Sequence, residues 1–300
     1  DQNQLTFAFD GSAGAATKVR PDPKAVRSAQ KDASTAKPAP RSVKRQRNPA
    51  RAAVKRATAE SMALQQRDIS VSEFFAKNRH LLGFDNKRKA LLMSVKEAVD
   101  NALDACEEAG ILPDIDVAVT QLDEDRFRIA VADNGPGIVK QQIPNIFGKL
   151  LYGSKFHRLK MARGQQGIGI SAAGMYGLLT TGQSIRVTSR TGPKKDAHYY
   201  EIQIDTRKNV PQIVKDATVD VDWPHGTKVE IDLVGSYNKG RQSVDEYIEL
   251  TAIANPHARF VYHMPTGETT EYPRATEQLP PPTAEVKPHP YGVELGVLIK

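Results

Sequence analysis

The stretch Ser94–Cys106, SVKEAVDNALDAC, has the pattern of an amphipathic helix. Apolar residues in and just before it recur at steps of three and four, which places them on one stripe: Leu91, Leu92, Val95, Ala98, Val99, Ala102, Leu103 and Cys106. Glu97 and Asn101 are one helical turn apart on the polar side, so their side chains point the same way. A carboxylate beside a carboxamide suits a site for a divalent cation and a water, because an amide oxygen is a ligand for Mg²⁺ and a carboxylate can accept a proton. The alternative is an ordinary helix whose polar face, which also includes Asp100 and Asp104, is solvated.

Three glycine-containing stretches follow this helix. Arg126–Ala132 alternates polar and apolar residues, which predicts a strand, and Asp133–Gly137, DNGPG, comes directly after it. Arg163–Ser171, RGQQGIGIS, and His225–Thr227, HGT, come later. Each stretch alone is typical of a turn, but their order after an acidic and asparagine-containing helix is a far more specific signal. The GxxxxGK[ST] P-loop is absent, and the glycines do not have the position of a Rossmann fingerprint.

These motifs resemble those of the GHKL ATPase superfamily, which includes gyrase, the heat-shock chaperone ATPases, histidine kinases and MutL. Glu97–Ala105 resembles its N-box, Asp133–Gly137 its second motif and Gly164–Gly169 its third. Within the superfamily the chain is most similar to the family of DNA topoisomerase VI B subunits, from about Ala59 to the last residue. The stretches that carry this closer resemblance are Phe147–Lys149, Tyr152–Phe156, Gly164–Ala173 and Lys287–Glu294.

The resemblance implies roles for three polar side chains. Glu97 matches the general base that orients and deprotonates the attacking water, and Asn101 matches the metal ligand for Mg²⁺. Asp133 matches the carboxylate that accepts a hydrogen bond from the amino group of adenine. Such an acceptor selects adenine over guanine, because guanine presents an oxygen at that position.

The remaining nucleotide-binding residues are implied in the same way. Gly135 and Gly137 let the backbone approach the base, and Thr227 binds the same region through water. Ser154 and Lys155 lie in a stretch, residues 151–163, that resembles the family's mobile lid, and we expect them to contact phosphates or sugar. The backbone of a loop and the helix that follows it is expected to hold the phosphates: Gly164, Gln165, Gln166, Gly167, Ile168, Gly169, Ile170 and Ser171.

The function implied by the resemblance is that of the ATP-binding and ATP-hydrolysing subunit of a type IIB DNA topoisomerase, with ATP and Mg²⁺ as cofactors. In that family, ATP-driven dimerisation of two B subunits clamps double-stranded DNA, and a separate A subunit cuts it in an assembly of two A and two B subunits. One alternative is a nucleotide-switched binding module, a B-like paralogue with little turnover, against which Glu97 argues. The other is a different GHKL ATPase, such as a MutL-like repair protein, against which His289–Leu295, HPYGVEL, argues.

The order of the expected elements indicates an α+β fold, a GHKL (Bergerat) sandwich with one mixed, mostly antiparallel sheet and helices on one face. Helices are expected at Ser70–His80, Asn86–Ala109, Gln142–Leu151, Ile168–Leu179 and Ser243–Ala254. Strands are expected at Ile115–Thr120, Arg126–Ala132, Ser184–Arg190, His198–Asp205, Gln212–Val221, Thr227–Leu233 and Arg259–His263. We assign residues 58–278 to the ATPase domain, including an N-terminal strap.

The two ends of the chain differ from its middle. Residues 1–57 contain 13 Lys and Arg and 4 Asp, a charge of +9 that leaves −2 for the rest of the +7 total. This segment has too few apolar residues to fold alone, so we expect a disordered basic tail that attracts DNA phosphates or only improves solubility. Residues 279–300 are expected to be a Pro-rich linker and the truncated start of a helix–two-turn–helix module. The family's transducer domain, whose lysine reaches the γ-phosphate, is not in this sequence, so weak dimerisation and slow hydrolysis are expected.

The composition also bears on location. Cys106 is the only cysteine, which excludes an intramolecular disulfide and a cysteine-based zinc site. The sequence has no stretch of 18 uncharged apolar residues, and its first residues do not resemble a signal peptide. We therefore expect a cytoplasmic, nucleoid-associated protein with no membrane partner.

Overall fold

The computed structural model describes residues 70–152, 163 and 168–282. The helices in this part of the chain are α2 (Val71–Asn78), α3 (Lys87–Glu108), the 3-10 helix η1 (Lys140–Gln142), α4 (Ile143–Gly148), α5 (Gly169–Thr181) and α6 (Val244–Ala254). The strands are β1 (Asp114–Gln121), β2 (Arg126–Asp133), β3 (Ile185–Arg190), β4 (Ala197–Asp205), β5 (Val210–Val219), β6 (Gly226–Val234), β7 (Arg259–His263) and β8 (Thr269–Tyr272). The basic tail predicted at residues 1–57 and the module predicted to start in 279–300 lie wholly or mostly outside the described residues.

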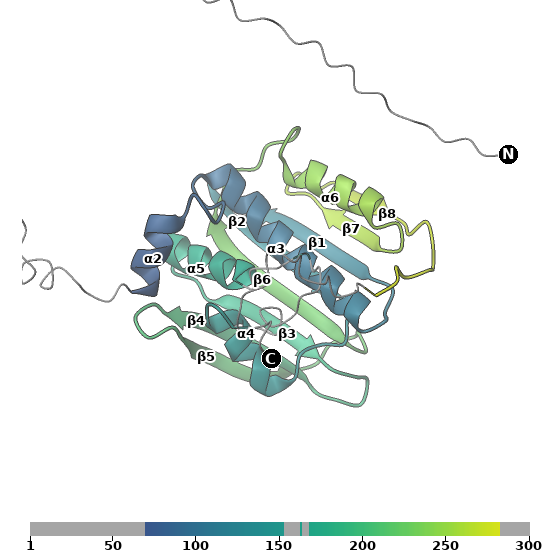
Figure 1. Ribbon diagram of the computed structural model, residues 1–300, viewed down its shortest axis with the longest axis horizontal. Helices are drawn as coiled ribbons and strands as arrows, with labels where there is room; N and C mark the ends of the chain where they lie inside the picture. Colours follow the sequence, from purple (N-terminus) through teal and green to yellow (C-terminus); the bar gives the residue numbers. More distant parts are fainter. Residues whose placement is uncertain (1–69, 153–162, 164–167, 283–300) are drawn as a thin grey trace, which may run out of the picture. The chain divides into compact units, whose positions relative to one another are not determined.

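The strands in this part of the chain form one mixed sheet in the order β5-β4-β3-β6-β2-β1-β7-β8 (Figure 1). Neighbouring strands are antiparallel except for β1 and β7, which are parallel. The register places Asp133 of β2 opposite Thr227 of β6, and Thr227 opposite Ser189 of β3. Three polar residues that are far apart in the sequence therefore meet at one end of the central strands.

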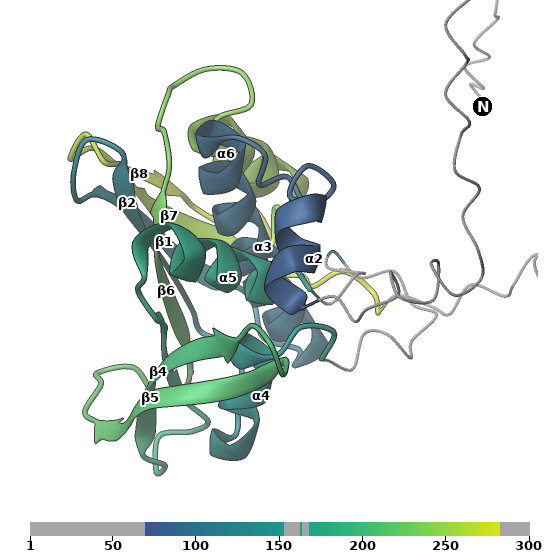
Figure 2. The ribbon, with the colours of Figure 1, turned by 90° about the vertical axis from the view of Figure 1, so that its left-hand side faces the viewer.

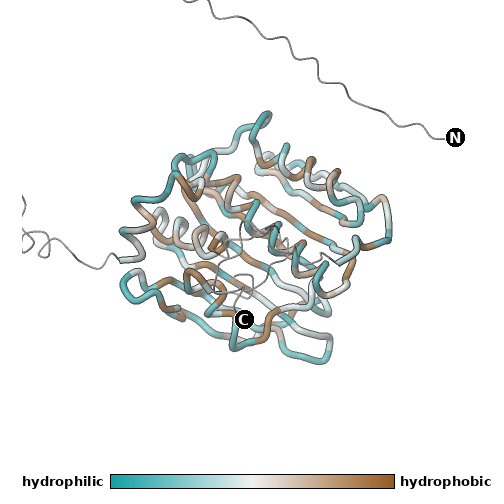
Figure 3. Tube along the Cα trace, viewed as in Figure 1, coloured by the Kyte–Doolittle hydropathy of each residue, from teal (hydrophilic) through white to brown (hydrophobic). Residues whose placement is uncertain are grey.

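The helices cover one face of this sheet (Figure 2). Alternate residues of β2, namely Phe127, Ile129 and Val131, are buried beneath them, and the residues between are only partly buried. Apolar residues accordingly concentrate along the strands and on parts of the helices (Figure 3). Burying each of these large side chains contributes about 1.5–3 kcal/mol, so the hydrophobic pattern decides which face the helices cover. The predicted α+β class, with a mostly antiparallel sheet, is confirmed.

The central helix, α3, begins after Asn86, whose side-chain oxygen accepts a hydrogen bond from Lys89 N at 2.8 Å. The predicted apolar stripe is buried except for Leu92, which is partly exposed. Asp100 and Asp104 on the polar side are only 6% and 7% exposed, so the alternative of a solvated polar face does not hold for these two residues. They are buried because α6 and Arg163 cover that side of the helix, and their oxygens bind Tyr247 Oη at 2.9 Å and Arg163 Nη1 at 3.0 Å.

Most predicted boundaries agree within two residues, and two elements differ more. The helix expected at Gln142–Leu151 is α4, which ends at Gly148, and the 3-10 helix η1 comes directly before it. Strand β8 was missed because its four residues, TTEY, contain no apolar alternation. β8 exists through its antiparallel pairing with β7 at the edge of the sheet. None of the helices in the described residues is long and apolar enough to cross a membrane.

Candidate nucleotide site

Asp133 is the last residue of β2, and its side chain is fixed through one oxygen. Oδ1 accepts hydrogen bonds from Gly135 N at 2.9 Å and from Thr227 N at 3.3 Å. The described residues give Oδ2 no hydrogen bond. One carboxylate oxygen is thus held by the backbone, and the other can accept a hydrogen bond from a ligand.

Burial raises the pKa of the Asp133 carboxyl from 3.8 to about 6, against the opposing effects of the Gly135 and Thr227 N–H groups and the His225 ring. Desolvation is the largest influence because it penalises the charged form. At neutral pH the carboxylate still exceeds the acid by roughly ten to one, given a pKa near 6. Asp133 is therefore an acceptor at neutral pH and becomes a donor in mild acid.

A hydroxyl network lies behind this carboxylate. Ser189 Oγ accepts a hydrogen bond from Ile138 N at 2.8 Å and lies 3.0 Å from Thr227 Oγ1 and 3.1 Å from Gly226 O. Ser189 is fully buried and Thr227 is 7% exposed. The network joins β3, β6 and the chain after β2, and it fixes the loop that carries the DNGPG motif.

Two glycines make this tight arrangement possible. Gly137 has φ +70° and Gly226 has φ +141°, which L side chains rarely adopt. A β-carbon at Gly137 would overlap the carbonyl of Arg190, and one at Gly226 would overlap the carbonyl of Asp133. His225 Nδ1 lies 2.8 Å from Gly135 O, which ties the DNGPG loop to the residue just before β6.

Glu97 of α3 points to the beginning of α5. A β-carbon at Gly169, the first residue of α5, would overlap the Glu97 carboxylate. Asn101 lies one turn further along α3 and is partly buried. The predicted base of the N-box and the end of the predicted phosphate loop are therefore adjacent, although 72 positions separate them in the sequence.

The other residues predicted at the start of α5 lie differently. Ile168 and Gly169 are partly buried, whereas Ile170 is 8% exposed and belongs to the core. Ser171 is 1% exposed, and its hydroxyl donates to Ile146 O and Lys149 O, both at 3.2 Å. Only the backbone of Ser171 could serve a phosphate, because its side chain ties α5 to α4.

The side chains near Asn101 show whether this part of the structure fits the predicted magnesium ion. Within the described residues, no group of three or more His, Cys, Asp or Glu side chains could hold a metal. An amide oxygen alone fits an ion that keeps several waters and binds substrate phosphates, which is the usual preference of Mg²⁺. The residues present fit Mg²⁺ that arrives with a nucleotide.

Six predicted site residues lie outside the described residues: Ser154, Lys155, Gly164, Gln165, Gln166 and Gly167. The prediction also missed residues that the structure brings to the site. Ser189 carried no recognised pattern, and Arg163 and His225 were noted only as members of the RGQQGIGIS and HGT stretches. A polar residue on the buried face of β3 is the one sequence signal that could have identified Ser189.

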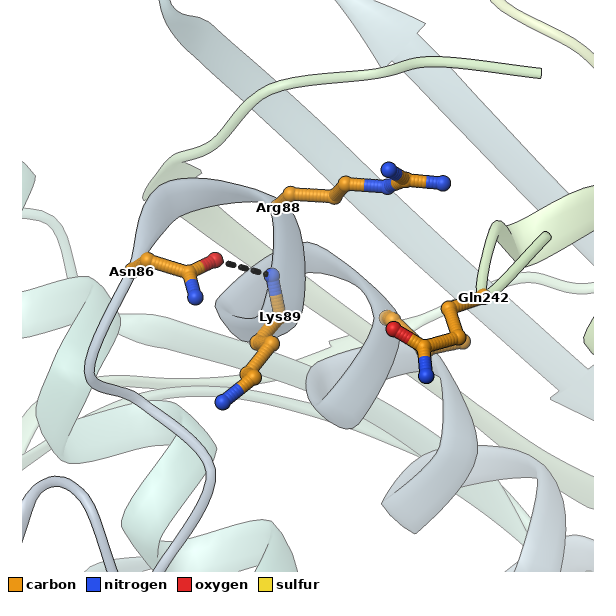
Figure 4. Close-up of a pocket in the computed structure, with 5 residues that line it drawn as sticks. Asn86, Arg88, Lys89 and Gln242 are labelled. Atoms are coloured by element: carbon orange, nitrogen blue, oxygen red, sulfur yellow. Dashed lines mark hydrogen bonds between the residues drawn. The ribbon is translucent and has the colours of Figure 1, made fainter. Parts of the chain in front are cut away.

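A separate cavity of about 470 Å³ lies at the N-terminal end of α3 (Figure 4). It is lined by Asn86, Arg88, Lys89, Leu92 and Gln242. Figure 4 shows the Arg88 and Lys89 side chains extending in different directions. None of the predicted nucleotide-site residues that the structure describes lines this cavity, so their site is a separate place in the fold.

Comparisons with known proteins agree with the motifs. Residues 86–208 match the family described as histidine kinase-, DNA gyrase B-, and HSP90-like ATPase. The chain is 54% identical over 243 residues to the B subunit of type 2 DNA topoisomerase 6 from Methanosarcina barkeri, covering 81% of this chain and 39% of that protein. It is 52% identical over 239 residues to the protein of the same name from Archaeoglobus fulgidus, covering 79% and 40%.

Among solved structures, the Aquifex aeolicus MutL ATPase domain complexed with ADP has a TM-score of 0.40 and 20% identity, covering 61% of this chain and 62% of that one. The chain spans about two-fifths of the length of the two topoisomerase subunits named above. Sequence identity above one half over four-fifths of the chain decides the relationship: the chain belongs to the family of type 2 DNA topoisomerase 6 B subunits and contains its histidine kinase-, DNA gyrase B- and HSP90-like ATPase domain.

Proposed function

We propose that this chain binds ATP with Mg²⁺ and hydrolyses it, as the nucleotide-binding part of a type IIB DNA topoisomerase. The observation that carries the proposal is the position of Glu97 against Gly169 at the beginning of α5. A candidate base lies beside a helix N-terminus, where backbone N–H groups and the helix dipole favour phosphate. Family membership supports the same proposal.

We propose the following role for each residue of the site. Asp133 Oδ2 accepts a hydrogen bond from the adenine amino group, while Oδ1 stays bound to Gly135 N and Thr227 N. Glu97 orients the attacking water and takes its proton. Asn101 is the protein ligand of Mg²⁺, which when bound neutralises charge on the phosphate oxygens. The first turn of α5, from Ile168 to Ser171, offers backbone N–H groups to the phosphates.

Calorimetry with Mg-ATP and Mg-GTP tests the assignment of Asp133. We expect ATP to bind more tightly, because an ionised carboxylate only accepts hydrogen bonds and guanine presents an oxygen there. Asp133→Ala should weaken ATP binding and remove the preference for ATP. Equal affinities of the unmodified chain for the two nucleotides would rule the assignment out.

Turnover tests the assignment of Glu97. Glu97→Ala should retain ATP binding and lower the hydrolysis rate by roughly 10²–10⁴-fold, the usual contribution of a general base. An unchanged hydrolysis rate in the variant would place the base elsewhere. No measurable hydrolysis by the unmodified chain, with normal binding, would instead favour a nucleotide-switched module.

For the complete protein we propose the activity that the names of its relatives indicate. Two copies would close on double-stranded DNA when ATP binds, and a separate A subunit would cleave the duplex. With this chain alone, sedimentation should show a monomer without nucleotide and a dimer fraction that rises with protein concentration when a non-hydrolysable ATP analogue is added. A stable dimer without nucleotide would contradict ATP-driven closure.

A further inference from the structure

Asn134, the second residue of the DNGPG loop, is held by the connection between α3 and β1. Its Oδ1 accepts a hydrogen bond from Asp114 N at 2.9 Å, and its Nδ2 donates one to Leu112 O at 3.1 Å. The thiol of Cys106, in the last turn of α3, lies 3.5 Å from the same Oδ1. Both ends of the amide are used, so its orientation is fixed as well as its position.

The Asn134 side chain continues the pairing of β1 and β2 beyond the end of the strands. The last backbone pair at this end is Ile115 with Asp133. The Asn134 amide offers the same donor and acceptor as a peptide group and bonds the chain just before Ile115. The backbone after Asp133 is therefore free to turn back, and Gly135 N donates to Asp133 Oδ1 at 2.9 Å. Asn134 thus anchors the turn that holds the Asp133 carboxylate.

The α3–β1 connection is a firm support because it is bonded on both sides. On one side, Arg259 N donates to Pro113 O at 2.9 Å, and Arg259 Nη1 donates to Asp114 Oδ1 at 2.7 Å. On the other side, Ile111 N donates to Cys106 O at 2.9 Å. The connection is therefore tied to β7 and to the end of α3, the helix that also carries the candidate base.

We infer that Asn134 is a positioning residue for recognition of the adenine amino group: it fixes the DNGPG loop on the α3–β1 connection and so directs Asp133 Oδ2. The inference rests on the proposed ATP binding. A hydrogen bond weakens steeply as its angle departs from linear, so a loop that can shift loses the bond from the amino group before it loses other contacts with the nucleotide. Asn134 acts through Asp133 and touches no reacting atom.

The test compares Mg-ATP with the magnesium complex of purine riboside triphosphate, which differs from ATP only in lacking the 6-amino group. By calorimetry the unmodified chain should bind ATP roughly 10–100-fold more tightly, the usual contribution of a hydrogen bond to a charged group. Asn134→Ala should lower this ratio at least about fivefold and leave the affinity for purine riboside triphosphate within about threefold of that of the unmodified chain. Equal weakening of both nucleotides would indicate a general loosening of the site and would overturn the inference.

Asn209 provides a matched control, because its side chain makes the same pair of bonds elsewhere in the fold. Its Oδ1 accepts from Leu150 N at 2.9 Å, and its Nδ2 donates to Leu150 O at 3.1 Å. Asn209 has φ +52°, so glycine keeps the backbone conformation while removing both bonds. Asn209→Gly should leave the ratio of the two affinities unchanged. A fall as large as that in Asn134→Ala would mean that the effect does not come from Asn134.

Asn134→Ser separates positioning from folding. Its shorter polar side chain leaves room for a water that bonds Leu112 O and Asp114 N, so this variant should be more stable than Asn134→Ala and should still lower the ratio. An unchanged ratio in either folded variant would overturn the inference and leave the proposed function intact. Unfolding of both variants would also overturn it, because the bonds of Asn134 would then serve the fold itself. Failure of the unmodified chain to bind Mg-ATP would overturn the proposed function.

Discussion

At the scale of single residues, the burial of Asp133 makes its charged form costly but keeps one carboxylate oxygen for a ligand. Burial raises its pKa to about 6, while two backbone N–H groups and His225 act against the shift. A protein that needed only a turn residue after β2 could place an exposed carboxylate there without this cost. The buried carboxylate keeps Oδ2 as an acceptor at neutral pH, which is the property that the proposed recognition of adenine requires.

The raised pKa of Asp133 predicts a pH-dependent stability. The folded state holds the proton more tightly than the unfolded state, so this stabilisation is fully present below pH 3.8 and is lost as the pH rises to about 6. Asp133→Asn cannot ionise, so we expect that the stability of this variant does not fall over the same pH range. Urea unfolding of both proteins at pH 4.5 and pH 7 should show the unmodified chain losing roughly 1–3 kcal/mol relative to the variant. If the free energies of unfolding of the two proteins differ by the same amount at both pH values, the pKa of the Asp133 carboxyl is not raised.

Gly169 is the residue on which the placement of Glu97 depends. Gly169→Ala should displace the flexible end of the Glu97 side chain, because a β-carbon would overlap its carboxylate. We expect the fold to survive and hydrolysis to fall at least about tenfold, since a misplaced base loses most of its contribution.

Gly174→Ala on the same helix is the control for Gly169→Ala. Its β-carbon would lie 3.4 Å from Ile185 Cδ1, an ordinary contact, and hydrolysis should not change. Equal rates in the two alanine variants would show that Glu97 does not act from beside Gly169.

At the scale of elements, α5 lies unusually close to β6. A β-carbon at Gly177 would lie 2.7 Å from Asp232 O and 2.8 Å from Ile231 Cγ2. Tyr176 Oη donates to Val234 O at 3.0 Å and Thr181 Oγ1 to Asp232 O at 3.2 Å, so hydroxyls of the helix also bind the strand backbone. The small residues of α5 permit this approach, and the approach holds the N-terminus of α5 near Glu97.

The close packing of α5 predicts opposite effects for two glycines. Gly177→Ala should destabilise the fold by about 1–3 kcal/mol, because the backbone of β6 cannot move aside without cost. Gly174→Ala should be neutral or stabilise the fold by up to about 1 kcal/mol, because alanine favours the helix and has room there. Thermal unfolding of the two variants distinguishes the outcomes, and an unchanged midpoint for Gly177→Ala would contradict the tight packing.

At the scale of the whole molecule, charge separates the predicted tail from the ATPase domain. Residues 1–57 carry +9 and the remaining residues −2, so any general attraction to DNA belongs to the tail. Deleting residues 1–57 should leave ATP binding unchanged and flatten the dependence of DNA affinity on salt. Log K falls as log salt concentration rises, and each phosphate that the shortened chain no longer neutralises makes this slope shallower by about 0.9. Fluorescence anisotropy at salt concentrations between roughly 50 and 200 mM measures the slope, and an unchanged slope would mean that the tail does not touch the DNA.

The sequence by itself determined most of the elements, the fold class and the family. The periods of apolar residues indicated α3 and most strands. Glu97, Asn101 and Asp133 could be proposed as site residues because each lies in a local motif and the order of the motifs is specific. The short strand β8 and the end of α4 could not be predicted, because their conformation depends on pairing and packing with residues elsewhere in the chain.

Only the tertiary structure decided which side chains meet. Ser189 reaches Thr227 because β3 pairs with β6, and Glu97 meets Gly169 because α3 and α5 lie together on one face of the sheet. Asp100 and Asp104 are buried rather than solvated because α6 and Arg163 cover them. The physical reason is that a local pattern specifies the direction of a side chain from its own helix or strand, whereas its partner depends on strand order and helix packing, which are set by interactions between residues far apart in the sequence.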